Sequence, residues 1–405
     1  MSLLDKLSDP LVWKEYYWYK REHRHLTRSE DADLKKYIAE KEYLPVTEKV
    51  GSGGCFSIPQ KKLIRKMYTE KKRVVYTYPR EENYVLKLLT YLLLRKYDAV
   101  FSENLYSFRA SYGTARAMGR ILHTPGISRK FTYKADISNY FNTIDVDIML
   151  SDLREVLSDD PELYGLLAGI LTDRRAEDRG QIIEEDKGVM AGTPFAVFLA
   201  NVYLRRMDRE FLDKGILYAR YSDDVIVFCD TEDEREEAAA RVLSILSERK
   251  LKVNPKKEVR TAPGEMWTFL GISYENGQVD ISPVSKDKLK AKIRRKARNI
   301  KRWQARKGAR NDQAARAFIR SMNRKFFDCD ISSELTWTRW YYPLINTDVS
   351  LKEIDSYMQE WVRYLASGTH AKKKYDFRYQ DMKDSGYVSL VHEWYLYREN
   401  GFAEY

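Results

Sequence analysis

Two short apolar runs separated by adjacent aspartates constrain this sequence more than any other feature. The segment LYARYSDDVIVF, residues 217–228, has the pattern of a β-hairpin with Asp223 and Asp224 at its turn. Aspartate is common in turns because its side chain bonds nearby backbone N–H groups, so the pair alone has an ordinary structural explanation. A second strand-like run, residues 130–137, alternates apolar and polar residues and ends with Asp136 on its polar face. The sequence therefore predicts strands that carry carboxylates at their ends.

Carboxylates from separate strands suit the chemistry of nucleotide transfer. Phosphoryl transfer needs charge neutralisation and in-line positioning more than it needs covalent chemistry from the protein. Two Mg²⁺ ions about 3.5–4 Å apart supply both, and Mg²⁺ prefers carboxylate oxygens and substrate phosphates. Asp136, Asp223 and Asp224 are therefore candidate catalytic and metal-binding residues, with Mn²⁺ as an alternative ion.

Composition narrows the class of protein. A chain of 405 residues with 43% apolar residues can bury a sizeable core, and its length predicts two or three subdomains. The formal charge of +11 and the isoelectric point near 9.2 favour a polyanionic partner. Cys55, Cys229 and Cys329 form neither a disulfide framework nor a zinc pattern. No apolar run approaches the roughly 20 residues of a membrane span, so we expect a soluble, cytoplasmic protein that does not bind membranes.

The pattern along the chain predicts an α+β protein with three parts. Residues 1–60 read as a helical N-terminal extension with a flexible break at Gly51–Gly54, and residues 61–275 alternate strand-like and helical stretches. Residues 276–405 read as helical, with an apolar stripe that begins at Leu289. Between Lys286 and Lys325 there are 17 Lys or Arg residues and two Asp residues, which predicts a strongly basic surface.

Four segments, in order, resemble the motifs of reverse transcriptases. YSDD at 221–224 resembles the YxDD box, and KADISNYFNTID at 134–145 resembles the palm motif that supplies the first metal-binding aspartate. GVMAGTPFAVFLANVYLRRMD at 188–208 resembles the nucleotide- and template-contacting motif, and KKRVVYTYPREEN at 71–83 resembles a fingers strand. The resemblance covers about residues 60–280. It implies a right-hand polymerase, with fingers and an antiparallel palm sheet at 61–275 and a basic helical thumb at 276–405.

This resemblance implies roles for individual residues. The three aspartates hold the metal ions, and the Ile137 backbone adds a carbonyl. The expected nucleotide-binding residues are Arg73, Arg80, Phe141, Gly192 and Thr193, with Phe141 as the aromatic gate that crowds a ribose 2′-hydroxyl. Lys256 or Lys257 is the expected general acid. Residues expected at the template or primer are Arg109, which alternatively fixes the fingers, and the thumb residues Lys292, Arg295, Arg298 and Arg302.

The sequence departs from the family pattern where nucleotides are selected. Met190, Ala191 and Ala196 stand where Pro, Gln and Ser are more usual, which leaves the substrate preference open. Nothing resembles an RNase H, integrase or HNH endonuclease segment. The runs 96–109, 199–201 and 367–395 resemble bacterial abortive-infection and unknown-group reverse transcriptases, which act in antiphage defence, often with a structured non-coding RNA.

The expected partners follow from that resemblance. They are an RNA template, expected to be a structured non-coding RNA, together with dNTPs and a DNA product; a homo-oligomer or an accessory defence protein stays open. Alternatives are a retron-type reverse transcriptase and a template-independent or protein-primed DNA polymerase. An RNA-directed RNA polymerase, against which Phe141 argues, and an RNA-binding scaffold with an inactive palm are alternatives of other classes.

Overall fold

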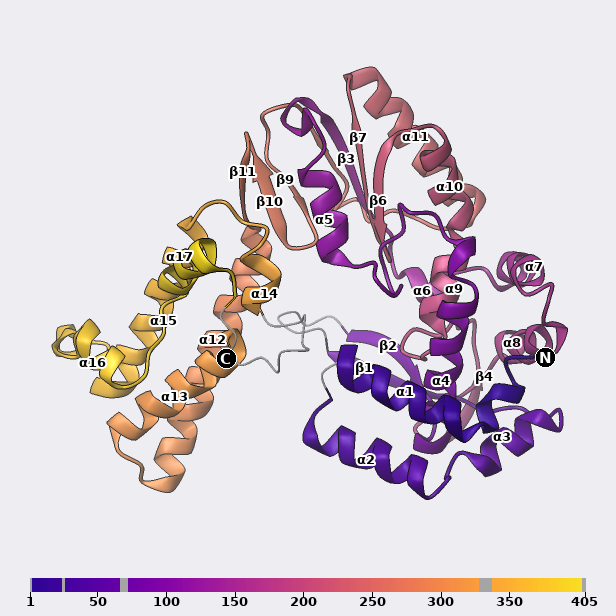
Figure 1. Ribbon diagram of the computed structural model, residues 1–405, viewed down its shortest axis with the longest axis horizontal. Helices are drawn as coiled ribbons and strands as arrows, with labels where there is room; N and C mark the ends of the chain where they lie inside the picture. Colours follow the sequence, from indigo (N-terminus) through magenta and orange to yellow (C-terminus); the bar gives the residue numbers. More distant parts are fainter. Residues whose placement is uncertain (1, 24–25, 66–71, 328–336, 403–405) are drawn as a thin grey trace. The chain divides into compact units, whose positions relative to one another are not determined.

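The chain forms two compact units, Met1–Gly264 and Glu265–Tyr405. The structure is a computed structural model that describes residues 2–23, 26–65, 72–327 and 337–402, so Cys329 lies outside the described residues. Strands and helices are both abundant, and nearly all strand pairs are antiparallel (Figure 1). The expected α+β class is confirmed. The finer division into three parts stays a prediction. Among the described helices, none combines the length and apolar character needed to span a bilayer.

The central sheet of the first unit carries the acidic hairpin. Its strand order is β6-β7-β3-β8, with every neighbouring pair antiparallel. The strands are β6 (Leu217–Tyr221), β7 (Asp224–Cys229), β3 (Phe131–Asp136) and β8 (Val259–Thr261). Helices α10 (Arg205–Asp213) and α11 (Glu232–Glu248) pack against this sheet (Figure 1). The hairpin and the strand that the sequence predicts are both present.

Burial along β3 differs from the expected pattern. Alternation predicts one apolar and one solvated face, yet Thr132 and Asp136 are as buried as Tyr133 and Ala135. The reason is that β3 lies inside the sheet, between β7 and β8, with helices packed on the sheet. Asp136 is only 5% exposed, so its carboxylate does not lie in bulk water.

A second sheet in the same unit has the order β2-β1-β4-β5. Its strands are β1 (Gln60–Arg65), β2 (Lys72–Thr77), β4 (Arg175–Asp178) and β5 (Gln181–Glu184). The N-terminal helices pack beside α4, and all of them share one hydrophobic core with the central sheet. These helices are α1 (Pro10–His23), α2 (Arg28–Ala39), α3 (Leu44–Gly51) and α4 (Arg80–Lys96).

The glycines at 51–54 form a helix end, which corrects the expected flexible break. Gly51 is the last residue of α3, and the next three N–H groups donate to the helix carbonyls of Glu48, Val50 and Lys49. Gly53 has φ +84°, and a Cβ at Gly54 would lie 2.6 Å from the Lys49 carbonyl oxygen. The glycines are needed because this turn folds tightly back onto its own helix.

Five further helices complete the first unit. They are α5 (Thr114–Leu122), α6 (Tyr140–Thr143), α7 (Val146–Val156), α8 (Pro161–Thr172) and α9 (Ala196–Tyr203). Helix α9 is buried almost throughout because it crosses the core between α4, α6, α7 and α10.

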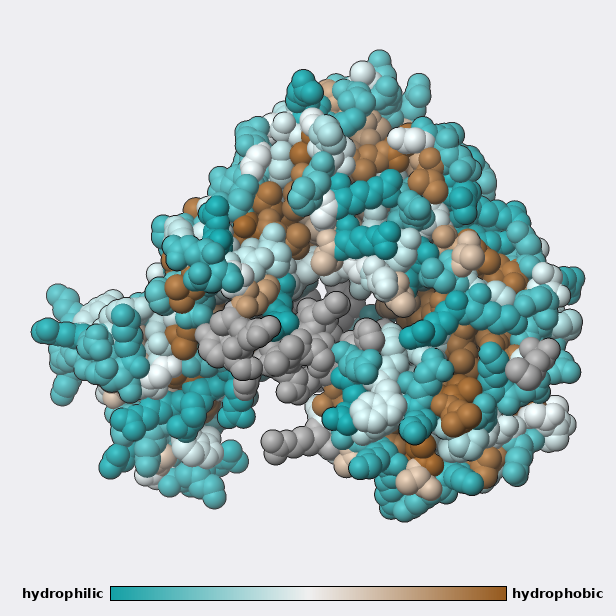
Figure 2. Space-filling model, viewed as in Figure 1, coloured by the Kyte–Doolittle hydropathy of each residue, from teal (hydrophilic) through white to brown (hydrophobic). Residues whose placement is uncertain are grey.

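The second unit is a small antiparallel sheet followed by helices. The sheet order is β11-β10-β9, from β9 (Trp267–Phe269), β10 (Ile272–Glu275) and β11 (Gln278–Ile281). The helices are α12 (Pro283–Lys307), α13 (Asn311–Phe326), α14 (Trp337–Tyr341), α15 (Val349–Ser367), α16 (Tyr379–Asp384) and α17 (Leu390–Asn400). The stripe Leu289, Ile293, Ala297 and Ile300 is buried, as predicted. Side chains over α13, α15 and α16 are largely hydrophilic on the face shown (Figure 2).

Candidate active site

The three aspartates meet at one end of the central sheet. Asp136 on β3 lies directly opposite Asp224 on β7, and the Ile137 N–H donates to the Asp223 carbonyl at 2.9 Å. Because that neighbouring pair is hydrogen-bonded, Asp136 and Asp224 form the non-hydrogen-bonded kind of pair, whose Cα atoms are roughly 4.5 Å apart. Side chains of directly opposite residues project from the same face of a sheet. The fold thus brings together carboxylates 87 positions apart (Asp136 and Asp223).

The hairpin turn fixes where Asp223 stands. Ser222 and Asp223 are the two residues between β6 and β7, and Ser222 has φ +59°. A positive φ at the first central residue alone is the pattern of a type II′ turn, which matches the twist of paired strands. Asp223 therefore sits at the tip of a regular two-residue hairpin, beside Asp136.

Negative charge at this end of the sheet is only partly compensated. Burial raises the pKa of Asp223, and the charge of Asp136 adds to this, although Lys257 and Arg73 oppose it. Burial also raises the pKa of Asp224, with Lys134 acting against it and the other two aspartates acting with it. Partly buried carboxylates that repel one another favour the binding of cations between them.

Two lysines partly balance the aspartates. The Lys257 Nζ atom lies 2.5 Å from the Asp136 Oδ2 atom. Burial acts to lower the pKa of Lys257, but the hydrogen bond to Asp136 and the attraction of all three aspartates raise it overall. Lys134 lies on β3 two residues before Asp136, and burial lowers its pKa. Both candidate general acids are exposed, and of the two it is Lys257 that forms an ion pair with one of the aspartates.

The donor set fits a divalent ion that also binds substrate. Carboxylate oxygens are the ligands that Mg²⁺ prefers, and Mg²⁺ commonly takes one or two of them and completes its shell with water and phosphate. Across the residues that the structure describes, no group of three or more His, Cys, Asp or Glu side chains is arranged to hold a metal ion. The binding of metal ions by the three aspartates stays a prediction.

A fully buried ion pair, which sequence reasoning missed, supports the hairpin. Arg220 donates from Nε and Nη2 to the two carboxylate oxygens of Asp208 at 2.8 and 2.6 Å, and both side chains are 0% exposed. Tyr218 also donates to Asp208, at 2.8 Å. The remaining donors of Arg220 reach the carbonyls of Ser222 and Asn201, each at 3.2 Å. One side chain thus joins the turn of the acidic hairpin to α9 and α10.

The backbone of Arg220 extends this support to another motif. Its N–H donates to the Asn104 carbonyl at 2.9 Å, and its carbonyl accepts from the Tyr106 N–H at 3.0 Å. Residues 104–106 begin the NLYSFR segment, which ends with Arg109. An arginine before YSDD and an aspartate at the end of the 188–208 motif were the available signals, but their pairing depends on the tertiary fold.

Phe141 and Arg73 lie together beside the acidic end of the sheet. The Arg73 guanidinium is 5.9 Å from the centre of the Phe141 ring, and its charge acts to lower the pKa of Asp223. Asn142 holds this neighbourhood in place: its side chain accepts from the Ala191 N–H at 3.0 Å and donates to the Val74 carbonyl at 3.3 Å. Asn142 is a second functional candidate that sequence reasoning missed.

Gly192 and Thr193 lie in a loop that packs against β2, with Gly192 exposed and Thr193 buried, and their contact with nucleotide stays a prediction. A Cβ at Gly192, where φ is +100°, would lie 3.0 Å from the Val75 Cβ atom and 3.1 Å from the Tyr76 carbonyl oxygen. Thr193 is 3% exposed, and its hydroxyl donates to the Met190 carbonyl at 2.9 Å. The glycine allows the 188–193 loop to lie close against β2.

Arg80 forms ion pairs within the protein, and its contact with a triphosphate stays a prediction. Its guanidinium forms ion pairs with Asp33, at 2.7 Å, and with Glu42, and it lies over the rings of Tyr37 and Tyr84. These partners come from α2, from the turn between α2 and α3, and from α4, so Arg80 joins α4 to the N-terminal helices. The sequence could not indicate these ion pairs because they depend on the tertiary fold.

Arg109 is engaged by neighbouring protein groups. It pairs with Asp98 through Nε at 2.7 Å and Nη2 at 2.9 Å, and it donates to the Ser102 and Leu105 carbonyls. Its guanidinium also lies 3.8 Å from the centre of the Tyr112 ring. With its donors satisfied and only 7% of its surface exposed, Arg109 fixes the loop before α5, and its contact with a template stays a prediction.

The four expected thumb residues share the exposed face of α12. Lys292, Arg295, Arg298 and Arg302 are all exposed, and their spacing puts them opposite the buried stripe of the same helix. Lys286 and Lys290 on this helix are instead ion-paired with Glu353 of α15. The four exposed residues therefore form the basic side of the helix that faces solvent.

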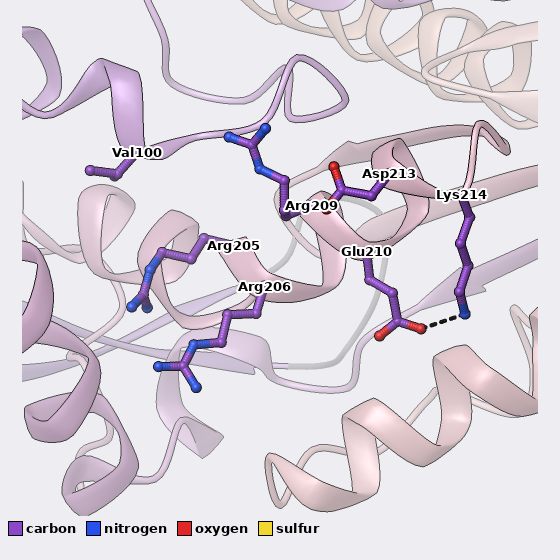
Figure 3. Close-up of a pocket in the computed structure, with 7 residues that line it drawn as sticks. All are labelled: Val100, Arg205, Arg206, Arg209, Glu210, Asp213 and Lys214. Carbon is purple, nitrogen blue, oxygen red and sulfur yellow. Dashed lines mark hydrogen bonds and ion pairs between the residues drawn. The ribbon is translucent and has the colours of Figure 1, made fainter.

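A cavity of about 500 Å³ lies beside α10, and none of the three aspartates lines it (Figure 3). Its lining is Val100, Arg205, Arg206, Arg209, Glu210, Asp213 and Lys214. Several charged groups of this lining are already engaged: Arg205 and Arg206 pair with Glu155, and Lys214 pairs with Glu210. This cavity is bordered by surface ion pairs and is not a substitute for the acidic site.

One protein family matches the part of the chain that holds the acidic site. A family described as reverse transcriptase (RNA-dependent DNA polymerase) matches residues 57–274, which include all three aspartates. No curated protein matches the sequence significantly.

Solved structures of yeast telomerases show a distant likeness. Apo telomerase from Candida tropicalis is 12% identical, with a TM-score of 0.49 over 86% of this chain and 73% of that chain. A form truncated from its C-terminal domain gives 13% identity and a TM-score of 0.46, over 56% of this chain and 55% of that chain. Telomerase from Candida albicans, in complex with a fragment of telomeric RNA, gives 11% identity and a TM-score of 0.46, over 88% of this chain and 68% of that chain. The chain thus spans about half the length of the truncated form.

Proposed function

Because this chain belongs to the reverse transcriptase (RNA-dependent DNA polymerase) family, we propose that it copies an RNA template into DNA by nucleotidyl transfer at Asp136, Asp223 and Asp224. The observation that carries the proposal is the register of the central sheet, which sets Asp136 opposite Asp224 and joins Asp223 to Ile137. Carboxylates so placed are the ligands that two-metal transfer requires.

In this proposal the aspartates hold two Mg²⁺ ions, with Mn²⁺ as a substitute. These ions would neutralise the triphosphate and lower the pKa of the primer 3′-hydroxyl. The chain's own groups do the remaining work: Arg73 binds the triphosphate, and Phe141 excludes a 2′-hydroxyl. Lys257, whose ammonium group lies 2.5 Å from Asp136, gives a proton to the leaving pyrophosphate. The Ile137 carbonyl remains an expected additional ligand.

The thumb part of the proposal concerns duplex binding. A polymerase must hold its primer–template by the backbone, regardless of sequence. The exposed face of α12 presents Lys292, Arg295, Arg298 and Arg302 for this purpose. Spacing along one helical face lets successive side chains reach successive phosphates.

Primer extension tests the proposed activity directly. The wild type and Asp223→Ala are supplied with an RNA template, a primer, Mg²⁺, and either dNTPs or NTPs. We expect incorporation of dNTPs only, lost in Asp223→Ala and retained in Asp230→Ala, whose exposed carboxylate follows the other end of β7. Incorporation of NTPs would instead indicate an RNA polymerase, and no incorporation by wild type would indicate an RNA-binding scaffold.

The finer assignment is to bacterial antiphage defence with a structured non-coding RNA. Its support is the resemblance of residues 96–109, 199–201 and 367–395 to abortive-infection and unknown-group enzymes. The test is to sequence the RNA bound to the protein, and the newly made DNA, from infected and uninfected cells. A cDNA of one bound RNA that responds to phage is expected. If no such DNA appears, the defence role fails while the polymerase activity stands.

A further inference from the structure

Helix α15 carries a stripe of aromatic side chains that its hydrophobic core does not use. Tyr357, Trp361 and Tyr364 are spaced by four and three residues, so they share one face, and all three are partly exposed. The buried face of α15 is a different one, formed by residues such as Met358 and Val362. The Trp361 ring meets the Tyr357 and Tyr364 rings edge-on, with centres 6.3 and 5.7 Å away. These rings form a continuous aromatic surface on the flank of the helix.

The segment after α15 contributes a further aromatic ring to this surface. Helix α15 ends before Gly368, whose φ of +76° turns the chain back, and the exposed His370 stacks on Tyr364. The two ring centres are 4.0 Å apart and the ring planes differ by 10°. This is the arrangement that a nucleobase adopts on an aromatic side chain. His370 thereby extends the Tyr364 stack toward solvent, where another flat ring can add.

One lysine lies close to a ring, and others follow His370 in the chain. The Lys301 Nζ atom of α12 lies 5.8 Å from the centre of the Tyr364 ring. The segment that follows His370 contains Lys372, Lys373 and Lys374, and it packs against α15. Lys374 is paired with Glu360, but Lys372 and Lys373 are exposed, and no ion pair joins either of them to another of the described residues. Aromatic rings can stack on the bases of a nucleotide chain, and exposed ammonium groups can bind its phosphates.

We propose that Tyr364, His370, Lys372 and Lys373 form a binding site for single-stranded RNA, which we call the α15 platform. Bases stack on the Tyr364–His370 pair, and the two lysines bind the adjoining phosphates. Double-stranded nucleic acid fits poorly, because the faces of its bases already stack on one another. An acidic peptide would satisfy the lysines but not the rings. The choice of RNA rests on the proposed function, since a template is single-stranded before it is copied.

The α15 platform is distinct from the exposed face of α12 that the proposed function assigns to duplex. Its rings lie on α15 and in the segment after it, whereas Lys292, Arg295, Arg298 and Arg302 belong to α12. The two sites also use different chemistry, because stacking depends on rings and duplex binding depends on charge. Substitutions can therefore separate them.

Anisotropy of a labelled, unstructured 12-nucleotide RNA measures binding to the full chain. EDTA is present and an unlabelled RNA–DNA hybrid is in excess, so duplex sites are filled and catalysis cannot contribute. We expect His370→Ala and Tyr364→Leu each to weaken binding by about tenfold, which corresponds to one good base stack. Changing Lys372 and Lys373 together to Gln should weaken binding and reduce its salt dependence by about 0.7 for each phosphate that is no longer neutralised.

Matched controls separate the platform from general effects. Tyr395→Ala, at an exposed ring of α17, and the pair Lys35→Gln and Lys36→Gln, on α2, should bind the RNA like wild type. His370 is exposed, so its variant should keep the wild-type melting temperature. Ring variants that bind normally, or equal competition by duplex RNA, an acidic peptide or single-stranded DNA, would overturn the proposal. Asp223→Ala should still bind this RNA, so failure of the polymerase assignment and failure of the platform give different results.

Discussion

Arg220 shows how a buried charged side chain can fix the position of a carboxylate in the candidate active site. Its guanidinium and the Asp208 carboxylate have no solvent exposure, and burial alone would lower the pKa of Arg220; the charge of Asp208 more than offsets this. A buried pair of this kind contributes little net stability compared with an apolar pair, but breaking it leaves one unpaired charge in the core. We interpret the pair as a device that holds the Ser222 turn, and with it Asp223, in one place.

Replacing Arg220 with Met should destabilise the first unit by about 3–5 kcal/mol, because Asp208 is left buried and unpaired. Urea unfolding measures the effect. Arg206→Met is the matched control, since this exposed arginine on the helix that carries Asp208 is paired with an exposed glutamate, and its cost should stay below about 1 kcal/mol. Adding Asp208→Leu to Arg220→Met should recover part of the stability. Equal destabilisation in the two single variants would contradict the role of the pair.

The aspartates should destabilise the protein when no metal is present. Burial and mutual repulsion raise the pKa of Asp223, so its charge opposes folding at neutral pH. Asp223→Asn should therefore melt higher than wild type in EDTA, by roughly 2–4 °C for a gain of about 1 kcal/mol. Adding Mg²⁺ should raise the melting temperature of wild type more than that of the variant. Asp230→Asn, which changes an exposed aspartate just after β7, should neither raise the melting temperature in EDTA nor change the response to Mg²⁺. A lower melting temperature for Asp223→Asn in EDTA would contradict this expectation.

At the scale of elements, the local sequence pattern predicted those features that depend on residues close together in the sequence. The β6–β7 hairpin and the buried stripe of α12 follow from short-range periodicity, and both are present. The roles of Gly192 and Arg80 could not be foretold in this way. Each is determined by a segment distant in sequence: β2 lies against Gly192, and α2 supplies the aspartate that pairs with Arg80. The same limit explains why the Arg220–Asp208 pair was missed.

The position of Phe141 on α6, beside Arg73 of β2, leads to a prediction about sugar selection. If Phe141 crowds the ribose 2′-hydroxyl, Phe141→Val should raise the efficiency of NTP incorporation relative to dNTP by roughly 10- to 100-fold, the range expected when a pocket gains a small volume. The ratio of kcat/KM values for one nucleotide pair measures this. Phe402→Val, at an exposed ring of the second unit, serves as the control and should leave the ratio unchanged. An unchanged ratio for Phe141→Val would remove its gate role.

At the scale of the whole molecule, positive charge is concentrated on α12. Helix α12 has twelve basic residues and one acidic residue. Composition predicted such a surface, and the helical pattern predicted which side of α12 would be exposed. Which of its lysines are neutralised could not be predicted, because Glu353 of α15, which pairs with Lys286 and Lys290, is more than sixty residues away.

Some basic residues of α12 are ion-paired with Glu353 and others are exposed. This difference predicts different effects when the two sets are substituted. Changing Lys292, Arg295, Arg298 and Arg302 to Gln should weaken primer–template binding and lower the salt slope by about 1 for each phosphate that is no longer bound. Changing Lys286 and Lys290 to Gln should have little effect, because Glu353 already neutralises them. Filter binding between 50 and 200 mM salt distinguishes the two. Equal slopes for both variants would show that the exposed face of α12 does not bind phosphate.

The most direct test of the central claim is to count divalent ions at the acidic end of the central sheet. Mn²⁺ bound to the full chain, with primer–template and a non-hydrolysable dNTP, can be counted and its environment read by electron paramagnetic resonance. We expect two magnetically coupled Mn²⁺ ions in wild type and no coupled signal in either Asp136→Asn or Asp223→Asn, with Asp230→Asn unaffected. A coupled pair that survives both substitutions, or the absence of one in wild type, would contradict the two-metal site.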